Sequence, residues 1–460
     1  MTNACLRLLL VLTLWASTSQ LIGQDTPMPP ARDLRLYHIA EAPSGQRIEQ
    51  DIQMLVDFGT RNTLSDTSST TRGIGAARRW IKAEFDRISE ACGGCLKVYY
   101  QRNLVQAEGN RRIPEDTWVV NVIAEKKGTR YPNRYIIMSG DIDSRASNST
   151  DATTDAPGAN DNASGVAGTL EAARVLSQYD FPATVVFAAL SGEEQGLFGG
   201  QHMAKVAKEE GWEVIGILNN DMIGNIEGID GVIDNTSFRV FSQANPVEET
   251  ERDRIWRRFY GGEVDGPSRQ LARYVDRVTD EYFTNLDAMM IYRLDRFGRG
   301  GHHRPFNDQG FPGVRIMETH ENYNRQHQDI REEDGIRYGD VIDKVNVEYA
   351  ARLTGVNAVT LASLAWAPPA PEGVMIGGAV RPSTRLKWDP VDDPDLAGYK
   401  VYWRETTEAQ WTHARFVPKG TTDYTLENII IDNYLFGVAS INQQGDESMV
   451  VYPTTLIPRR

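Results

Sequence analysis

Hydrophobic residues recur along the chain at two spacings, one typical of helices and one typical of strands. Between residues 33 and 95 the spacing is three or four, which predicts mainly helical structure. One helix face in GIGAARRWIKAEFDRI carries Ala77, Trp80, Ile81, Phe85 and Ile88. Farther along, short apolar runs predict buried strands at 118–124, 135–139, 184–190, 214–219 and 314–317. Helical segments at 163–179 and 199–210 separate some of these runs, so we expect an α/β fold, a mostly parallel central sheet flanked by helices.

Two other stretches complete this first domain. Residues 225–300 are charged, aromatic and irregular, apart from a helix expected at 267–279. An insertion of this kind is either packing at the rim of the sheet or a wall of a substrate pocket. Residues 337–366 predict one or two closing helices, and APPAPEG at 367–373 is a proline-rich linker. The α/β domain should therefore span 33–366.

Beyond the linker, residues 374–460 change to short alternating strands separated by turn residues, which predicts a small all-β sandwich. The early Trp388, the strand YKVYWR and the late strand containing Tyr434 resemble a fibronectin type III domain. A sandwich on a linker would contact a cell surface, a carbohydrate or the preceding domain. The linker also predicts that a chain ending there folds by itself.

The amino-terminal residues 1–23 have the layout of a secretory signal peptide. Arg7 precedes an apolar run at 8–16, and small and polar residues follow, with cleavage expected after Thr18 or Gly23. The alternative is a membrane anchor, but about ten apolar residues are fewer than the roughly 20 that span a bilayer. We therefore expect a secreted or periplasmic protein without a membrane span.

Composition narrows the range of partners. The formal net charge is −14, and no long run of lysine or arginine is present. Because phosphate binding needs a basic face, nucleic acid is not an expected partner. With 40% hydrophobic residues the chain has the composition of a globular protein.

Two cysteines, Cys92 and Cys95, remain after removal of the signal peptide, which contains Cys5. In an oxidising compartment a lone pair at this spacing predicts a local disulfide. The alternative is a redox-active CxxC motif, which normally follows a strand and opens a helix. Here the pair follows the helical segment 76–89, which favours the structural bond.

The residues with chemical potential follow the ends of predicted strands, where open α/β sheets place their sites. They lie in GDIDS at 140–144, GANDNASG at 158–165 and SGEEQG at 191–196, at Asp221, and far downstream at His327. Carboxylates converging on one rim would repel one another strongly. A pair of divalent cations would neutralise them, and zinc takes aspartate, glutamate and histidine ligands. Asp161, at the mouth of a loop of small residues, suits a carboxylate bridging two ions.

On the phrases APGANDNASG and SGEEQGLFGG, residues 70–365 resemble the co-catalytic di-zinc aminopeptidases, which share a fold with glutamate carboxypeptidase and glutaminyl cyclase. By position, Asp161 resembles the bridging ligand, with Glu194 and His327 on one zinc and Asp221 on the other. Glu193 resembles the general base that takes a proton from the metal-bound water.

The chain departs from this family at two points. The family's first ligand is a histidine in His-x-Asp, whereas Asp141 stands here, followed by Asp143 in the second place, which we assign to the catalytic group. The family often has Asp-His before Pro-Phe, whereas His302 and His303 precede Arg304-Pro305-Phe306 here. We expect Asp141 to bind zinc through oxygen, which would make manganese a tolerated substitute. The alternatives are a solvated Asp141 with one metal lost or weak, or a histidine from 302–303 in its place.

The resulting hypothesis is a secreted, metal-dependent exopeptidase that hydrolyses the amino-terminal bond of a peptide with two zinc ions and a glutamate base. Three alternatives stay open on the same scaffold. They are carboxypeptidase action, cyclisation of amino-terminal glutamine at a single zinc, and a non-catalytic binding ectodomain that has lost its metal. Substrate choice is expected to depend on residues 225–300.

Overall fold

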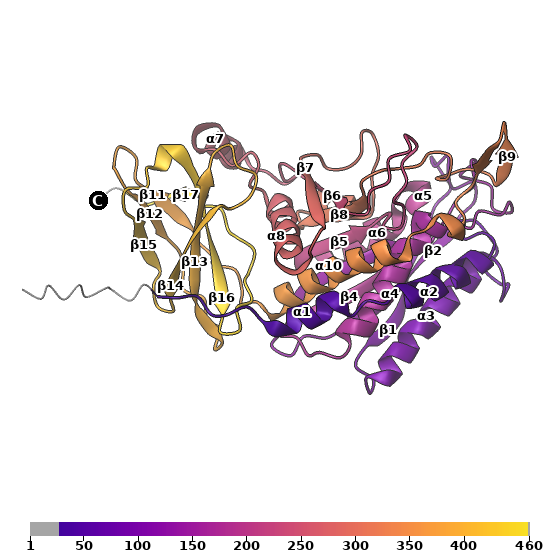
Figure 1. The fold of residues 1–460 in the computed structure, drawn as a ribbon, viewed down its shortest axis with the longest axis horizontal. Coiled ribbons are helices and arrows are strands. Elements are labelled where there is room, and N and C mark those ends of the chain that lie inside the picture. The colour runs from indigo at the N-terminus through magenta and orange to yellow at the C-terminus, as the bar shows by residue number, and fades with distance from the viewer. Residues whose placement is uncertain (1–26, 459–460) are drawn as a thin grey trace, which may run out of the picture.

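The computed structural model describes residues 27–458. The predicted signal peptide, 1–23, lies outside the described residues. The described chain has two parts, an α/β part and a β-sandwich at the carboxyl end (Figure 1). No helix among the described residues is both long and apolar enough to cross a membrane.

A large sheet lies at the centre of the α/β part, with strands in the order β1-β2-β4-β3-β5-β8-β6-β7. The strands are β1 (Lys97–Val105), β2 (Thr117–Lys126), β3 (Tyr131–Asp141), β4 (Ala183–Leu190), β5 (Glu213–Asn220), β6 (Ser237–Ser242), β7 (Asp287–Ile291) and β8 (Gly313–Glu318). The central strands β4, β3, β5 and β8 are parallel. The sheet as a whole is mixed, because β1, β2 and β6 each join a neighbour in antiparallel fashion.

Helices cover both faces of this sheet. One face carries α1 (Leu34–Glu41), α2 (Gly45–Asp57), α3 (Gly73–Ala91), α4 (Gly165–Leu176), α8 (Pro267–Tyr282) and α10 (Val347–Trp366). The other carries α6 (Phe198–Glu209) and α9 (His303–Asp308). The remaining helices are α5 (Glu193–Gly196) and α7 (Glu251–Tyr260). One closing helix, α10, therefore stands where one or two were expected, and the residues before it form the hairpin β9 (Arg331–Glu333) and β10 (Ile336–Tyr338).

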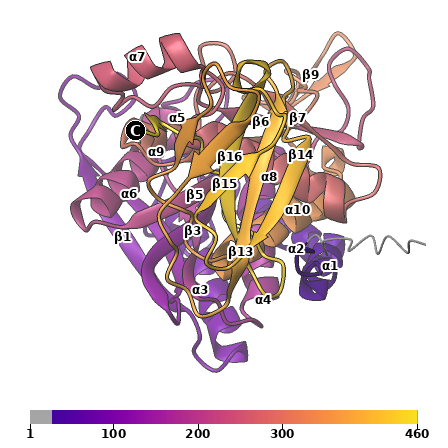
Figure 2. The ribbon, with the colours of Figure 1, turned by 90° about the vertical axis from the view of Figure 1, so that its left-hand side faces the viewer.

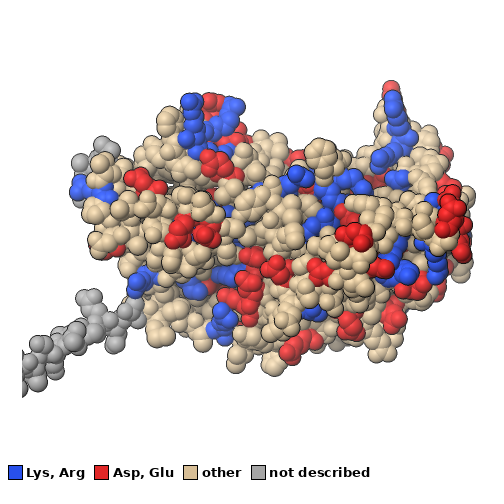
Figure 3. All heavy atoms as spheres, turned by 45° about the horizontal axis from the view of Figure 1, so that its top comes forward, with Lys and Arg blue, Asp and Glu red and all other residues tan. Residues whose placement is uncertain are grey.

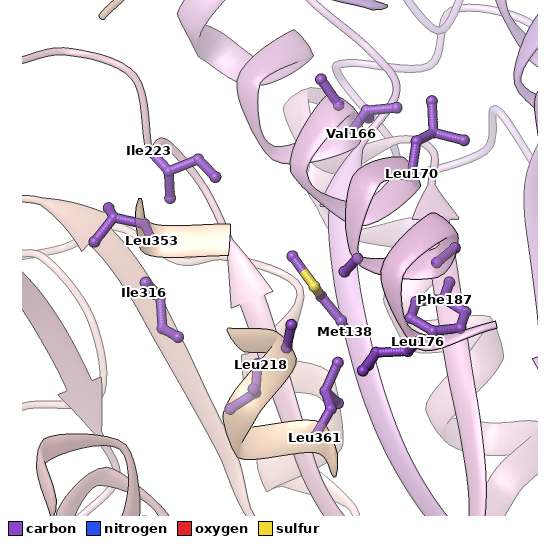
Figure 4. Packing of buried hydrophobic residues seen from close by; sticks show 14 of the residues in the cluster. Met138, Val166, Leu170, Leu176, Phe187, Leu218, Ile223, Ile316, Leu353 and Leu361 are labelled. Carbon is purple, nitrogen blue, oxygen red and sulfur yellow. The ribbon is translucent and has the colours of Figure 1, made fainter. Parts of the chain in front are cut away.

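Successive side chains of the central strands point to opposite faces of the sheet and belong to two separate hydrophobic cores. In β3, Ile136 and Met138 belong to the core beneath α4 and α10, whereas Tyr135 and Ile137 face the core beneath α6. Figure 4 shows Met138 between the α4 residues and Leu361. Because both faces of the central strands are covered, these strands are apolar along most of their length.

Residues 225–300, which we expected to be irregular, contribute two strands to the sheet. In β6, Phe238 and Val240 are buried, and Arg239 points to the other face, where it pairs with Glu321. The sequence pattern did not predict this strand, because the charged Arg239 stands between its apolar residues. The predicted helix at 267–279 is confirmed as α8.

The carboxyl-terminal part consists of two sheets with a shared core. One sheet has the order β15-β12-β11-β17 and the other β14-β13-β16. Their strands are β11 (Met375–Gly377), β12 (Thr384–Lys387), β13 (Leu396–Glu405), β14 (His413–Pro418), β15 (Asp423–Leu426), β16 (Tyr434–Asn442) and β17 (Thr455–Leu456). Trp388 is buried between the sheets and packs edge-on against Tyr399. Figure 2 views the molecule from the sandwich end.

The sandwich is joined to the α/β part by buried charged contacts. Arg404 of β13 donates to both oxygens of Asp265, at 2.8 and 2.9 Å, and both side chains are fully buried. Arg273 of α8 donates to the carbonyl of Ala409 at 2.6 Å. Such contacts do not fit the independent folding that the linker predicts.

Cys92 and Cys95 form the predicted disulfide. The bond follows the last residue of α3, so the pair lies at a helix carboxyl terminus. That end of a helix dipole does not stabilise a thiolate, which supports a structural role. On the face shown in Figure 3, basic and acidic side chains are interspersed.

Candidate metal centre and catalytic site

Three side chains from distant parts of the chain meet beside the sheet. Asp161 lies in the helical turn Ala159–Ser164, Glu194 in α5 after β4, and His327 in the loop after β8. Nε2 of His327 is 3.0 Å from Asp161 Oδ2 and 2.9 Å from Glu194 Oε1. Within residues 27–458 this is the only group of three His, Cys, Asp or Glu residues whose ligand atoms all lie within 4.8 Å of one another.

Glycines and backbone contacts hold the two carboxylates in place. Gly192, at φ 74°, lets the chain turn from β4 directly into α5, so Glu193 and Glu194 follow the strand at once. Gly158, at φ 51°, precedes the turn that carries Asp161. The Asp340 carboxylate accepts the backbone N–H of Asp161 at 2.7 Å. These two loops are therefore fixed by contacts that do not depend on a ligand.

The charges of the three side chains are strongly linked. Burial would lower the pKa of His327, but the Glu194 and Asp161 carboxylates outweigh it and raise that pKa to about 10. Burial would likewise raise the pKa of Asp161, yet the hydrogen bond and charge of His327 hold it below its usual range. The site thus stabilises a positive charge on His327, beside the carboxylates of Asp161 and Glu194.

This donor set fits a zinc ion. Two carboxylates and one imidazole are ligands that zinc takes, and three protein ligands leave a position for water or substrate in a catalytic site. A dication would satisfy both carboxylates and accept neutral His327 as the third ligand. Gln326 donates to Asp161 Oδ2 at 3.0 Å and would orient that carboxylate.

Glu193 stands next to this group. Its side chain is partly buried, and burial together with the nearby Asp221 and Glu194 charges raises its pKa well above the usual value. A glutamate of raised pKa beside a metal site is suited to accept and return a proton near neutral pH. No such role follows for Glu194, whose carboxylate contacts His327.

Asp143 lies beneath the two glutamates. Its carboxylate accepts the backbone N–H of Glu193 at 3.2 Å and of Glu194 at 3.0 Å, and the hydroxyl of Thr63 at 3.1 Å. The side chain is 1% exposed. These contacts are those of a positioning residue, which fixes the start of α5.

Asp141 and Asp221, the other two predicted ligands, are not part of the three-residue group. Asp141 Oδ1 is 2.5 Å from Nδ1 of His302, and its Oδ2 accepts from Asn162 at 2.7 Å. Asp221 Oδ2 is 2.9 Å from a guanidinium nitrogen of Arg315. Burial raises the pKa of Asp221 to about 8 although Arg315 opposes this, and burial and Asp143 raise the pKa of Asp141 well above its usual value.

The two consecutive histidines differ in their surroundings. His302 bonds Asp141, whereas Nε2 of His303 bonds the carbonyl of Leu294 at 2.8 Å and lies 3.6 Å from Asp295. Burial lowers the pKa of each to about 4. Neither belongs to the group of ligand atoms around His327.

Sequence reasoning missed Arg315 and its partner Asp295. Arg315 is fully buried in β8, and one guanidinium nitrogen donates to both oxygens of Asp295, at 3.0 and 3.1 Å. The signal was present, because an arginine inside the apolar run FPGVRIM needs a buried acidic partner. Asp295 itself, in a charged loop, carries no comparable signal.

Comparison with known proteins supports a peptidase assignment. Residues 121–342 match the model of peptidase family M28. A Leptosphaeria maculans protein named as a probable zinc metalloprotease is 42% identical over 426 residues, covering 92% of this chain and 98% of that protein. A protein of the same description from Pyrenophora tritici-repentis is 40% identical over 430 residues, covering 93% of this chain and 88% of that protein.

Among solved structures, the LapA aminopeptidase of Legionella pneumophila superimposes with a TM-score of 0.52. The two chains are 19% identical, and the match covers 72% of this chain and 74% of that one. At this identity the likeness establishes a common fold.

Proposed function

This chain belongs to peptidase family M28, and from that membership we propose that it is a zinc-dependent aminopeptidase with its metal at Asp161, Glu194 and His327. The observation that carries the proposal is the convergence of these three donors beside Glu193. The convergence of acid, base and metal donors in one place favours an enzyme over a binding ectodomain.

In this mechanism Asp161, Glu194 and His327 would hold the cation. A bound zinc would polarise the scissile carbonyl and acidify water. The Glu193 carboxylate accepts a proton from the attacking water and returns it to the nitrogen of the leaving amine. Asp143 keeps that carboxylate in place through the backbone of α5.

The charge of the site favours an amino-terminal over a carboxyl-terminal substrate end. Carboxylates of Asp141, Asp161, Glu193, Glu194 and Asp221 surround it. An α-ammonium group is attracted to such surroundings, whereas an α-carboxylate needs a cationic partner of its own. The fully buried Arg315 already pairs with Asp221 and Asp295, and the partly buried Arg145 lies 3.8 Å from Glu194 Oε2.

Peptides with blocked ends test the proposal. The full-length protein is given one pentapeptide in free, amino-acetylated and carboxyl-amidated forms, and the products are identified by mass spectrometry. We expect release of the first residue from the free and amidated peptides and none from the acetylated one. A chelator should abolish the reaction, and zinc should restore it. Release of the last residue would instead make the protein a carboxypeptidase.

A glutaminyl cyclase activity is the second candidate, and the single three-donor group favours it. A peptide beginning with glutamine separates the two reactions. An aminopeptidase releases free glutamine and a shortened peptide, whereas a cyclase releases ammonia and leaves a pyroglutamyl peptide of unchanged residue number.

We further propose that the protein is exported. The proposal is supported by the apolar run at 8–16, and the disulfide at Cys92–Cys95 is compatible with an oxidising compartment. Amino-terminal sequencing of the protein secreted by an expression host would test it. A mature terminus after residue 18 or 23 is expected.

A further inference from the structure

Arg315, in β8, is a permanently charged side chain that contacts Asp221, one of the predicted metal ligands. Its guanidinium is fully buried and makes contacts on three sides. Nε donates to the carbonyl of Asp221 at 2.5 Å, and NH1 donates to Asp295 and to the carbonyl of Gly300 at 2.8 Å. The third nitrogen, NH2, is 2.9 Å from Asp221 Oδ2.

This guanidinium competes directly with a metal ion on Asp221. Zinc binds a carboxylate oxygen at about 2.0–2.2 Å, so an ion on Oδ2 would lie within about 5 Å of the guanidinium nitrogen that contacts the same oxygen. Two positive charges at that separation repel in a buried site. Displacing the guanidinium would remove the cation that lies closest to Asp295, at 3.0 Å, and both residues are buried.

Asp141 offers no free oxygen to a second ion. Oδ1 is held by His302 and Oδ2 by Asn162, whose amide also donates to the carbonyl of Asn220 at 2.7 Å. Asp221 keeps one oxygen away from Arg315, and Asp161 keeps one oxygen away from His327. Among the described residues, no second set of three His, Cys, Asp or Glu ligand atoms lies within 4.8 Å of one another, whereas catalytic zinc sites use three protein ligands.

We infer that this protein binds a single metal ion, and that the Arg315 guanidinium carries the positive charge that a second ion would bring to Asp221. The inference rests on the zinc site of the proposed function but is independent of the reaction catalysed there. Arg315 is accordingly a positioning residue, because it fixes the Asp221 carboxylate beside Glu193 through a permanent charge that needs no metal.

Metal content tests the inference without any substrate. The full-length protein is saturated with zinc, gel-filtered into metal-free buffer and measured by inductively coupled plasma mass spectrometry. We expect one zinc per chain in the wild type, nearly none in His327→Ala, and one in both Asp221→Asn and Asp141→Asn. Two zinc ions in the wild type, with one lost in Asp221→Asn, would overturn the inference.

A zinc titration of Arg315→Ala, followed by calorimetry, tests the role of the guanidinium. Removing it frees Asp221 and Asp295, so the folded variant should bind a second zinc, whereas the control Arg239→Ala should bind one. A folded Arg315→Ala that still binds one ion would contradict the assignment to Arg315. If this variant does not fold, the zinc contents of the wild type and of Asp221→Asn decide whether a second ion binds. A protein that binds one zinc but has no peptidase activity would contradict the proposed function and support this inference. A protein that binds two zinc ions and has peptidase activity would support the proposed function and contradict this inference.

Discussion

Glu193 and Glu194 are neighbours in sequence, yet their carboxylates have different surroundings. The Glu194 carboxylate contacts His327. Glu193 is held instead through its backbone N–H, which donates to the Asp143 carboxylate. The separation arises because α5 starts within one residue of Gly192, and successive side chains of a helix point about 100° apart. One turn of helix thus carries both the proposed metal donor, Glu194, and the proposed base, Glu193.

We therefore predict that Glu193→Gln lowers kcat by about 10²–10⁴-fold, because the amide cannot accept the proton of water. Zinc content and melting temperature should stay at wild-type values. The matched variant Glu194→Gln should instead lose zinc, since an amide is a weaker ligand than a carboxylate. Near wild-type turnover of an amino-acid anilide by Glu193→Gln would remove its assignment as the base.

At the scale of elements, the site depends on how closely β3 approaches α4. A Cβ atom on Gly140 would lie 2.3 Å from the backbone carbonyl carbon of Gly165, at the start of α4. Backbone cannot move aside as a flexible side chain can, so only glycine allows this contact. Gly140 immediately precedes Asp141, and Gly165 follows the turn that carries Asp161.

We predict that Gly140→Ala destabilises the protein by about 1–3 kcal/mol and lowers zinc affinity, because it pushes the two loops apart. The control is Gly377→Ala in β11, where a Cβ would meet only ordinary contacts at 3.4 Å or more. Urea unfolding and zinc titration of both variants measure the effects. Equal behaviour of the two variants would show that the approach of α4 tolerates a methyl group.

At the scale of the whole molecule, the sandwich and the α/β part share buried ion pairs. Asp265 is held by Arg404 of β13 and also by Arg273 of α8, at 3.3 Å. Removing one partner of a buried pair leaves an uncompensated charge, which costs more than the pair itself contributes. A chain ending at residue 373 would lose Arg404 together with the surface that covers α8.

We predict that Arg404→Ala lowers the free energy of unfolding by about 3 kcal/mol, the lower end of the range for buried pairs because Arg273 remains. Arg385→Ala, which removes a largely exposed partner of Asp423 in the same sandwich, should lower the free energy of unfolding far less, because water screens an exposed ion pair. Urea unfolding gives both values. A similar small loss for Arg404→Ala would restore the expectation of two separable domains.

Glu447 makes the same junction sensitive to acid. It accepts from Arg277 of α8 and from Tyr402 of β13, both at 2.5 Å, and pairs with Lys400. Burial would raise its pKa, but Arg277 and Lys400 outweigh burial and lower the pKa to about 2. A carboxyl group whose pKa is lower in the folded state stabilises the protein above its unfolded value of about 4.3. This contribution disappears as the pH falls toward 2.

We therefore predict that the stability difference between the wild type and Glu447→Gln shrinks as the pH is lowered from 5 to 2. The glutamine variant lacks this titration, and all other carboxyl groups are common to both proteins. The difference in free energy at pH 7 should be up to about 3 kcal/mol. Melting temperatures at pH steps measure it, and a constant difference across the range would exclude Glu447 as the acid-sensitive group.

The sequence by itself determined the elements and the local chemistry of this protein. The spacing of apolar residues is a property of each segment alone, so the central strands, α8 and the sandwich strands could be predicted. The disulfide joins cysteines three residues apart, and the glutamate pair and Asp161 lie in short phrases that follow strand ends. The strand β6 was not predicted, because the charged Arg239 stands between its apolar residues. The two strands at the edges of the sheet, β1 and β7, were not predicted either.

Only the tertiary structure decided which distant side chains meet. His302 reaches Asp141 across 161 residues, and Arg404 reaches Asp265 across 139. Such pairs depend on the order and register of strands in the sheet and on the packing of its two parts, which no local pattern encodes. The neighbours of Asp141 and Asp221 were for that reason invisible in the sequence. A cluster of carboxylates predicted two metal ions, and the fold places the guanidinium of Arg315, from β8, against one of these carboxylates, Asp221.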